Sequence, residues 1–521
     1  MNMNRTRTRT SALSVAMTTI LLGGAVLTGC SSQKPESPPA GSAPGGDAKQ
    51  EAPKSVKPVK LDIIEPGSGL PAPDQDQIKQ ELDKALGIET NLTVYASNDD
   101  YKNQLNVRMA SGNFPDLFSV DRAQLKQYVE QGLLLDLTPY KDKLKPTIDF
   151  IGADTVKKGT LNGKHYAVAK APQIPYNTFW IRKDWLDKVG LKPPTTIDEL
   201  LEAAVAFTEK DPDGNGKKDT FGLTGGKLGA FYPVFGAFGV GGPGNFYEKD
   251  GKVMNAFYDP AFKDALAFIK KMVDTGAVDP ELLSNNSTPQ FQQKGIKGQA
   301  GIMWIDWPNV TKDEFVAQIK AVNPQAEWIQ LPALKGPGGQ FEGAYDIGTS
   351  AGMYAIPKGL EKNPEKLNKV IELLNYVSTQ DTGSALVQFG IKGKHYNLEN
   401  GKVVPTELMG KEVNYSWLYQ FTGRPEVEYL YVKFAKQAPF IEFASKQPRI
   451  SALNGFVDNP TGFNSADAQR YIDEELAKFV YGKRLLTEYD AFIKTLETSM
   501  NYKSYLDAGM KQLAELGFGK K

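Results

Sequence analysis

Hydrophobic residues recur along the chain with two different periods. Between residues 75 and 86, Ile78, Leu82 and Leu86 fall on one face of a helix, and Gly87 is typical of the residue that ends one. Short, compact apolar runs predict strands instead. The first part of the chain then has strands at 61–64, 92–95 and 117–120 and helices at 75–86, 99–111 and 123–131. Strand and helix alternate, which favours an α/β fold built on a mostly parallel sheet.

The same alternation continues through the rest of the chain. Thr196 followed by Glu199 is the signature of a capping box that opens a helix. The pairs Asn162-Gly163 and Asn400-Gly401 are typical of hairpin turns. Further strands are predicted at 178–181, 301–305, 328–331 and 353–356, and further helices at 260–275, 311–322, 364–377 and from 465 to the end. We find no internal repeat.

The first thirty residues have the pattern of a secretory signal. Three arginines within the first nine residues precede an uncharged stretch from Ser11 to Gly29. Cys30, the only cysteine, follows Leu-Thr-Gly, and this order resembles the lipobox of bacterial lipoproteins. The resemblance implies that residues 1–29 are a lipoprotein signal peptide and that the Cys30 thiol receives a diacylglycerol, an acyl lipid anchor. An ordinary signal peptide with an incidental cysteine is the alternative.

Residues 30–59 are predicted to be a disordered tether. The stretch from Ser31 to Pro58 is rich in Ser, Pro, Gly, Ala and Lys and has almost no large apolar side chain. Such a segment cannot bury enough apolar surface to compensate for the entropy lost on ordering. We therefore expect a flexible leash between the lipid and the folded body.

Charge and length limit the function classes that are open. Without residues 1–29, 492 of the 521 residues remain, which is enough for two or three domains. The remaining Lys plus Arg number 58 and the Asp plus Glu 61, so nucleic acid is not an expected partner. After Cys30 there is no cysteine for an internal disulfide. No later apolar run approaches the roughly 20 residues that a membrane span requires.

A calcium-binding motif occupies residues 211–220. Oxygen-bearing side chains stand at positions 1, 3, 5 and 9 of this loop, and a glycine stands at position 6, where a calcium loop turns sharply. The candidate ligands are Asp211, Asp213, Asn215 and Asp219, with the backbone carbonyl of Lys217 at position 7. Position 12 is Gly222 instead of a bidentate glutamate, so we expect a structural site of modest affinity, about 0.1–1 mM. A polar turn without metal is the alternative.

Two catalytic patterns are present but lack their structural context. Gly348–Gly352 matches the G-x-S-x-G nucleophile elbow, and Asp381 and His395 follow it in hydrolase order, but no apolar strand precedes the serine. Gly239–Gly244 matches G-x-G-x-x-G without a flanking strand and helix. His165 is the only other histidine, so we expect no catalytic residues. A pair of acidic residues serving a glycosidase remains an open alternative.

The aromatic residues suit a site for sugars. Pyranose rings present apolar faces and polar edges, so their sites combine flat aromatic rings with carboxylates and amides. We expect Trp185 and Trp328 in the core and Trp307 and Trp417 in a binding cleft, while strand positions leave Trp180 and Trp304 open. The candidates for substrate binding are Tyr176, Asn177, Trp180, Tyr232, Trp304, Asp306, Trp307, Tyr415 and Trp417.

Three segments carry a family resemblance. Residues 110–118, Ala-Ser-Gly-Asn-Phe-Pro-Asp-Leu-Phe, resemble the ASG-x-x-PD-[IL] segment of extracellular solute-binding protein family 1. Residues 179–188 with 194–196 resemble that family's RKDWLDKLG…P-x-T crossing, and residues 298–303 are similar to its GKAAM strand. The likeness extends over essentially the whole chain after Cys30. It is closest to substrate-binding lipoproteins of carbohydrate ABC transporters, including the alginate-oligosaccharide-binding kind.

The resemblance implies a type II periplasmic-binding-protein-like fold. Its two α/β lobes, each a mostly parallel sheet flanked by helices, are joined by hinge strands and close on a ligand. The chain would cross near Pro172 and return near Gly336–Gly343. The expected lobes are 60–172 with about 340–400, and 173–339 with about 401–521. In related lipoproteins a calcium loop follows the same helix, and the residue after Asp219, often an acid there, is Thr220 here.

The resemblance also implies a function. The chain would be a monomer on the extracytoplasmic face of the cell membrane, held there by its lipid alone. It would capture an oligosaccharide between the lobes and deliver it to the permease of an ABC importer, without being an enzyme. An exported glycoside hydrolase or lyase, and a peptide-binding receptor on the same fold, are the alternatives.

Overall fold

The fold is known from a computed structural model that describes residues 57–379 and 383–519. The chain divides into two units, Met1–Ser55 and Val56–Lys521, and the fold below is that of the second unit. The predicted signal peptide, Cys30 and nearly all of the predicted tether lie outside the described residues. In the described part, no helix is long and apolar enough to cross a membrane.

The first sheet has five strands in the order β2-β1-β3-β16-β6. The strands are β1 (Val59–Pro66), β2 (Ile88–Tyr95), β3 (Leu117–Val120), β6 (Ala167–Ala169) and β16 (Met353–Ala355). β1 pairs in parallel with both β2 and β3, whereas β16 pairs antiparallel with β3 and β6. The strand that returns to this sheet late in the sequence therefore lies between two early strands.

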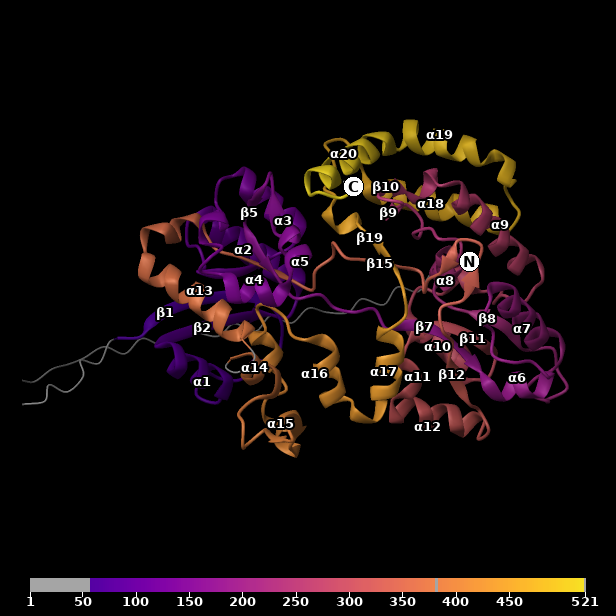
Figure 1. The fold of residues 1–521 in the computed structure, drawn as a ribbon, viewed down its shortest axis with the longest axis horizontal. Helices are drawn as coiled ribbons and strands as arrows, with labels where there is room; N and C mark the ends of the chain where they lie inside the picture. The colour runs from indigo at the N-terminus through magenta and orange to yellow at the C-terminus, as the bar shows by residue number, and fades with distance from the viewer. Residues whose placement is uncertain (1–56, 380–382, 520–521) are drawn as a thin grey trace, which may run out of the picture. The chain divides into compact units, whose positions relative to one another are not determined.

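Helices cover both faces of the first sheet because successive strand residues point to opposite faces. Leu61 and Ile63 of β1 pack with α1 (Gln77–Leu86) and α13 (Pro364–Ser378). Ile64 packs with α2 (Asn98–Ser111) and α3 (Arg122–Glu130) on the other face. Figure 1 shows α13, in orange, running along the indigo strands. We call the buried residues around this sheet the first core.

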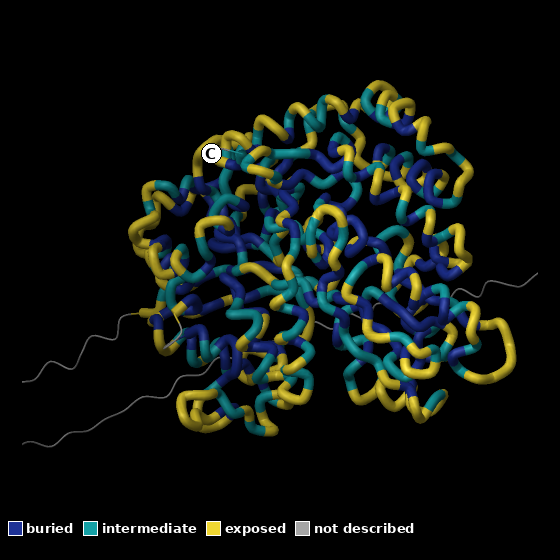
Figure 2. The backbone as a smooth tube through the Cα atoms, turned by 45° about the vertical axis from the view of Figure 1, so that its right-hand side comes forward, coloured by how far each residue is buried: buried dark blue, intermediate teal, exposed yellow. Residues whose placement is uncertain are grey.

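The second sheet has four strands in the order β12-β7-β11-β8. They are β7 (Asn177–Arg182), β8 (Phe221–Thr224), β11 (Ala300–Asp306) and β12 (Trp328–Gln330). One face packs on α7 (Ile197–Glu209) and α9 (Pro260–Asp274) through residues that include Phe179 and Ile302. The other face carries Trp180, Met303 and Ile305. The sheet is thus buried on both sides, and dark blue segments run through the interior in Figure 2.

A third sheet joins distant parts of the sequence in the order β10-β9-β19-β15. Its strands are β9 (Phe246–Lys249), β10 (Lys252–Asn255), β15 (Ala344–Asp346) and β19 (Ile450–Ala452). β15 and β19 pair in parallel, so two segments that lead away from the second sheet lie side by side. The chain then ends in α18 (Ser465–Val480), α19 (Tyr489–Ser499) and α20 (Tyr502–Glu515), yellow in Figure 1.

Shorter elements complete the described fold. The helices are α4 (Lys145–Ile151), α5 (Ala153–Lys158), α6 (Lys183–Val189), α8 (Tyr232–Ala237), α10 (Thr288–Ile296), α11 (Pro308–Thr311), α12 (Asp313–Val322), α14 (Ala385–Phe389), α15 (Glu407–Glu412), α16 (Glu426–Lys433) and α17 (Ala438–Ser445). The strand pairs are β4 (Thr160–Leu161) with β5 (Lys164–His165), β13 (Lys335–Gly336) with β14 (Gly339–Gln340), and β17 (Tyr396–Glu399) with β18 (Lys402–Pro405).

The predicted elements are confirmed with two corrections. The sheets are mixed and not mostly parallel. β16 runs antiparallel to both of its neighbours in the first sheet, and β7 runs antiparallel to both of its neighbours in the second sheet, because the chain reaches each of these strands from another sheet. The helix predicted at 311–322 is broken at Lys312, whose backbone is extended, so that α11 and α12 are separate. Both Asn-Gly hairpins and the capping box of α7 form as predicted.

The lobe boundaries stay a prediction, and the packing differs from them in more than one place. Residues beyond 400 were expected with the second sheet. Five of them instead belong to the first core, where they pack beside β1 and α13: Val413, Tyr415, Leu418, Tyr419 and Phe421. Phe389 and Tyr396, which were expected with the first sheet, lie in the cluster that contains Trp180 and Met303 of the second sheet. By packing, the chain therefore contacts the second sheet at the hairpin of β17 and β18, returns to the first core from Val413 to Phe421, and leaves it after Phe421.

Candidate functional site

Polar side chains meet where two neighbouring strands of the second sheet end. Asn177, at the start of β7, pairs in register with Asp306, at the end of β11. Burial raises the pKa of Asp306 to about 6, and its Oδ1 has no hydrogen-bond partner among the described residues. Tyr176 precedes β7, is buried, and likewise has an unpartnered hydroxyl. Tyr176 and Asp306 therefore each keep a buried, unpartnered polar atom beside Asn177 at one strand edge.

Glu342 lies buried beside the same strands. Its Oε1 accepts hydrogen bonds from the backbone N–H of Phe179 at 3.1 Å and from the indole N–H of Trp304 at 3.0 Å. Its Oε2 has no partner in the described part of the chain. Because the residue is 0% exposed, burial raises the pKa of Glu342 to about 7. Glu342 thus fixes the orientation of the Trp304 ring.

Lys312 lies near Asp306, and Arg449 supplies positive charge near both acids. Its Nη2 donates to the carbonyl of Asn177 at 2.8 Å, and its Nη1 donates to the carbonyls of Ala444 and Gln447. Burial lowers the pKa of Arg449, while the charges of Glu342 and Asp306 act in the opposite direction. One guanidinium therefore holds β7 to the segment before β19 and balances the two carboxyl groups.

Trp304 and Tyr232 form an aromatic corner next to this polar group. Their ring centroids are 5.4 Å apart and the rings meet edge to face. Trp304 is half-buried and Tyr232 is 37% exposed, so both rings keep free surface. An edge-to-face pair with one open face is the kind of surface on which an apolar sugar face can rest.

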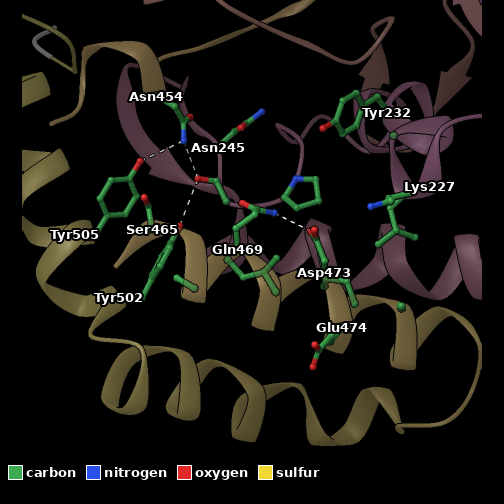
Figure 3. A pocket seen from close by; sticks show the side chains of 18 of the residues that line it. Lys227, Tyr232, Asn245, Asn454, Ser465, Gln469, Asp473, Glu474, Tyr502 and Tyr505 are labelled. Carbon is green, nitrogen blue, oxygen red and sulfur yellow. Dashed lines mark hydrogen bonds between the residues drawn. The ribbon is translucent and has the colours of Figure 1, made fainter. Parts of the chain in front are cut away.

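Tyr232 also lines a cavity with a volume of about 730 Å³. Figure 3 shows Tyr232 on one side of it and Gln469 and Asp473, from α18, on another. Gln469 donates to Asp473 at 2.8 Å. The other wall residues labelled there are Lys227, Asn245, Asn454, Ser465, Glu474, Tyr502 and Tyr505. The volume lies within the range of about 300–1,000 Å³ typical of ligand pockets.

Two smaller cavities lie along the segments that connect the sheets. One, of about 230 Å³, is lined by Lys158, Ala171, Gln173, Ile174, Tyr345 and residues 349–351. Lys158 donates to the carbonyl of Thr349 at 2.7 Å, and the Tyr345 hydroxyl donates to the carbonyl of Gln173. The other, of about 390 Å³, lies at the end of β3 and includes Asp121 and Arg122. Connecting segments therefore carry hollows lined by polar groups.

Glu65, at the end of β1, is a second buried acid. The hydroxyl of Tyr354 donates to its Oε2, and its Oε1 is unpartnered among the described residues. Burial raises the pKa of Glu65 to about 7, while the nearby charge of Lys170 acts to lower it. Lys170 lies over the Tyr354 ring, 5.5 Å from its centroid. Each of the two main sheets thus ends in a buried carboxyl group.

Several predicted substrate-binding residues are core residues instead. Trp180 is fully buried and packs against Phe440, and Trp307, 3% exposed, packs against Phe434. Phe434 and Phe440 come from the region of α16 and α17, which covers this face of the second sheet. Tyr415 is buried in the first core, and its hydroxyl accepts the backbone N–H of Ile78. These three rings cannot stack on a sugar without leaving their contacts.

Trp417 is the exposed exception. It is 39% exposed and lies close to Gly67, directly after β1. Trp185 is fully buried as predicted, whereas Trp328, which was expected in the core, is half-buried. The structure thus brings Tyr176, Asn177 and Asp306 together and pairs Tyr232 with Trp304. Trp417 lies apart from them, beside the first sheet.

The predicted calcium loop is compact and ordered around one amide. The side-chain nitrogen of Asn215 donates to Asp213 at 2.7 Å and to Asp219 at 3.2 Å, and Asp211 accepts the backbone N–H of Gly216. Partial burial and the neighbouring carboxylates raise the pKa of Asp213. Among the described residues no three carboxylate, thiol or imidazole groups are gathered closely enough to hold a metal ion. The side-chain amide of Asn215 bridges the carboxylates that a calcium ion would otherwise bridge. The carboxylate and amide oxygens of this loop are of the type that calcium prefers as ligands.

Thr220 does not fit that ligand set. Its hydroxyl donates to the carbonyl of Phe207 at 2.8 Å, and the residue is buried against α7. The side chain is therefore committed to anchoring the start of β8, and we remove it from the candidate ligands. Lys217 remains a candidate only through its backbone carbonyl.

The discounted catalytic patterns do not assemble. Ser350 donates to the carbonyl of Gly352, next to the connecting segments, while His395 is buried beside Glu412 and accepts the backbone N–H of Ile391. Asp381 lies outside the described residues. The two described groups of the apparent triad therefore serve separate local structures.

Glu342 and Arg449 are functional candidates that the sequence did not reveal. Glu342 stands between glycine-rich residues after β14, and Arg449 follows Pro448 just before β19. From the sequence, a charged residue in such a segment is predicted to lie in a loop and to be exposed to solvent. Their hydrogen bonds to β7 come from more than a hundred residues away in the sequence, and no local pattern signals that pairing.

Comparison with known proteins identifies the family. The family model described as "Bacterial extracellular solute-binding protein" matches residues 67–383. The chain belongs to this family. Its fold is accordingly the two-lobe type II fold of solute-binding proteins.

Individual relatives agree with this assignment. Lipoprotein LipO of Bacillus subtilis is 29% identical over 369 residues, which cover 68% of this chain and 72% of LipO. The fructooligosaccharide ABC transporter substrate-binding protein FusA of Streptococcus pneumoniae is 25% identical over 470 residues, 82% of this chain and 84% of FusA. The solved HMO-binding, ABC-transporter-associated solute-binding protein of Bifidobacterium longum infantis has a TM-score of 0.67 at 19% identity, covering 89% of this chain and all of that one.

Proposed function

We propose that this protein captures an oligosaccharide between its two lobes and delivers it to the permease of an ABC importer. Family membership supports a binding function, and relatives such as FusA are named for oligosaccharide binding. Ligand contacts from both lobes would favour the closed arrangement, which the permease would recognise. The ligand would leave unchanged, so the site needs shape and hydrogen bonds but no catalytic group.

The observation that carries this proposal is the corner formed by Trp304 and Tyr232. An oriented indole and an exposed phenol ring lie on or beside one strand, β11. Aromatic faces contact the apolar face of a sugar. Such a surface is one that an oligosaccharide can use.

Calorimetry with a panel of oligosaccharides tests the proposal. We expect at least one sugar to bind, and we expect Trp304→Ala to weaken that binding about tenfold or more, about 1.4 kcal/mol. Tyr140→Ala, which changes another half-buried aromatic residue, is the matched control and should leave the affinity unchanged. Tight binding of peptides with no sugar binding, or steady release of product from a polysaccharide, would exclude this function.

We also propose that the protein is anchored in the cell membrane on the extracytoplasmic face by lipid on Cys30. The lipobox-like sequence supports this, as does the relative LipO, whose name identifies it as a lipoprotein. Cells fed a labelled fatty acid should label the wild-type protein and not Cys30→Ala, and the variant should appear in the medium or the soluble fraction. Equal labelling of both proteins would rule the anchor out.

Calcium is proposed as a structural ion of the 211–219 loop. At 2 mM calcium and an affinity of about 0.1–1 mM, the ion would add about 1 kcal/mol of stability. We expect Tm to rise with calcium in the wild type and not in Asp213→Asn. Asp198→Asn, an exposed acid in the first turn of α7, is the control that should keep the response. A calcium response that persists in Asp213→Asn would place the ion elsewhere.

A further inference from the structure

The cavity of about 730 Å³ is built without the first sheet. The residues that line it fall within 226–283 and 454–505, and helix α18 supplies one wall. The strands of the first sheet, and the helices that cover it, contribute none of the described lining residues. The shape of this cavity therefore does not depend on how closely the first sheet approaches the second.

Tyr232 joins the cavity to the aromatic corner. Its ring lines the cavity, and the same ring meets Trp304 edge to face with 5.4 Å between the centroids. Because Tyr232 is 37% exposed, a ligand can contact it directly. A ligand that rests on the Trp304 ring therefore reaches the cavity by passing a single phenol ring.

The glycine-rich segment that matches G-x-G-x-x-G helps to form this cavity. Pro243, Gly244 and Asn245 line it. A Cβ atom at Gly242 would lie 3.1 Å from the Tyr232 ring, which is closer than the roughly 3.5–4.0 Å of a favourable carbon–carbon contact. The absence of a side chain at Gly242 therefore lets the segment pack on Tyr232, so that this wall adjoins the aromatic corner.

The lining combines aromatic rings with a free amide. The rings of Phe463 and Tyr505 stack with their centroids 4.8 Å apart, and both residues are half-buried. Gln469 is exposed on α18 and uses one N–H to donate to Asp473 at 2.8 Å (Figure 3). Its other N–H and its carbonyl oxygen make no hydrogen bond to the described residues. Aromatic rings contact apolar sugar faces, and an amide can both donate to and accept from sugar hydroxyls.

The size of the cavity suits part of a larger ligand. Its volume lies in the upper part of the range of about 300–1,000 Å³ that holds whole small molecules, so it accommodates at least one sugar ring. Trp304 is not among the lining residues, so a sugar ring in the cavity leaves the Trp304 surface available for another unit of the same chain.

We infer that this cavity is a preformed subsite for the chain end of an oligosaccharide whose other units lie on the corner of Trp304 and Tyr232. The ligand class is then oligosaccharides longer than a disaccharide, which occupy both places at once. The inference rests on the proposed function, because it extends the same site. Since the first sheet contributes no wall, the subsite holds the chain end before the lobes close.

A length series tests the inference by calorimetry on the full mature protein. The series runs from the disaccharide to the hexasaccharide of whichever linkage binds best. We expect the affinity to rise at least tenfold from the shortest to the longest member, because only long chains contact both places. Equal or falling affinity with length would overturn this inference and leave the proposed function standing. Absence of binding for every sugar would overturn the two together.

A variant separates the cavity from the corner. Gln469→Ala should weaken binding of the longest oligosaccharide at least threefold, as the loss of a hydrogen bond implies, and leave the affinity of the shortest binding member unchanged. Gln318→Ala, at an exposed position of α12 that does not line the cavity, is the matched control and should change neither affinity. With the fold confirmed by circular dichroism, a Gln469→Ala protein that binds every length as the wild type does, or that loses the same factor at every length, would also overturn the inference.

Discussion

Replacing Glu342 with glutamine is expected to raise the free energy of unfolding above that of the wild type by more at pH 8 than at pH 5. Glu342 is fully buried, and glutamine keeps the oxygen that accepts hydrogen bonds from Phe179 and Trp304. At low pH the wild-type carboxyl is protonated and resembles the amide. At high pH it must carry a charge in a buried place, which the amide never does.

The sign follows from proton linkage. The pKa of Glu342 rises from its ordinary 4.5 to about 7 in the folded protein, so the folded state binds more protons than the unfolded state between these values. The contribution of Glu342 to wild-type stability therefore falls as the pH increases from about 4.5 to about 7 and is constant above that range. At 1.36 kcal/mol per pKa unit, the upper limit of the effect is about 3 kcal/mol.

Urea denaturation of both proteins at pH 5 and pH 8 measures this effect. The difference in unfolding free energy between variant and wild type should increase by up to about 3 kcal/mol in favour of the variant as the pH rises. Glu65 has a raised pKa of the same size, so part of the pH dependence should persist in the variant. Glu361→Gln, at an exposed position after β16, is the control and should show no such change. A pH-independent difference for Glu342→Gln would contradict the assignment of a buried charge.

Local patterns predicted the elements of this fold because their signals lie within a few residues. β3 is found at 117–120, as its apolar run indicates, and the box of Thr196 and Glu199 marks the start of α7. The directions of β7 and β16 were not predictable in the same way. Each strand is inserted between partners from another part of the sequence, and only the completed sheet determines its orientation.

The candidate site was predicted only in part for a related reason. Tyr176, Asn177 and Asp306 follow the rule that strand ends carry functional side chains, and the structure brings them together. Trp307 has polar neighbours in the sequence, but Phe434, far along the chain, covers its ring. Glu342 is buried by the same kind of distant contact. Burial imposed by distant segments cannot be read from neighbouring residues.

Replacing Asp184 with asparagine is expected to destabilise the protein by about 3 kcal/mol. Asp184, in α6, accepts two hydrogen bonds from Arg182, at 2.8 and 2.6 Å. Arg182 is 1% exposed and its guanidinium lies over the Trp185 ring, 4.6 Å from the ring centroid. Removing one partner of a buried ion pair leaves the other charge uncompensated, which costs about 3–5 kcal/mol. The amide of asparagine recovers part of the hydrogen bonding, so we expect a loss of stability at the lower end of this range.

The experiment has a control within the same helix. Asp187 pairs with Lys183 at the surface of α6, and Asp187→Asn should change stability by no more than about 0.5 kcal/mol, as exposed pairs do. Hydrogen bonds to Arg182 hold the pKa of Asp184 below its ordinary value despite burial, so its contribution is complete at pH 7 and is lost as the pH falls through that lowered pKa. The gap between the two variants in urea denaturation should therefore be smaller at pH 3 than at pH 7. Equal effects of the two variants at pH 7 would mean that the Arg182 pair contributes no more than an exposed pair, despite its burial against Trp185.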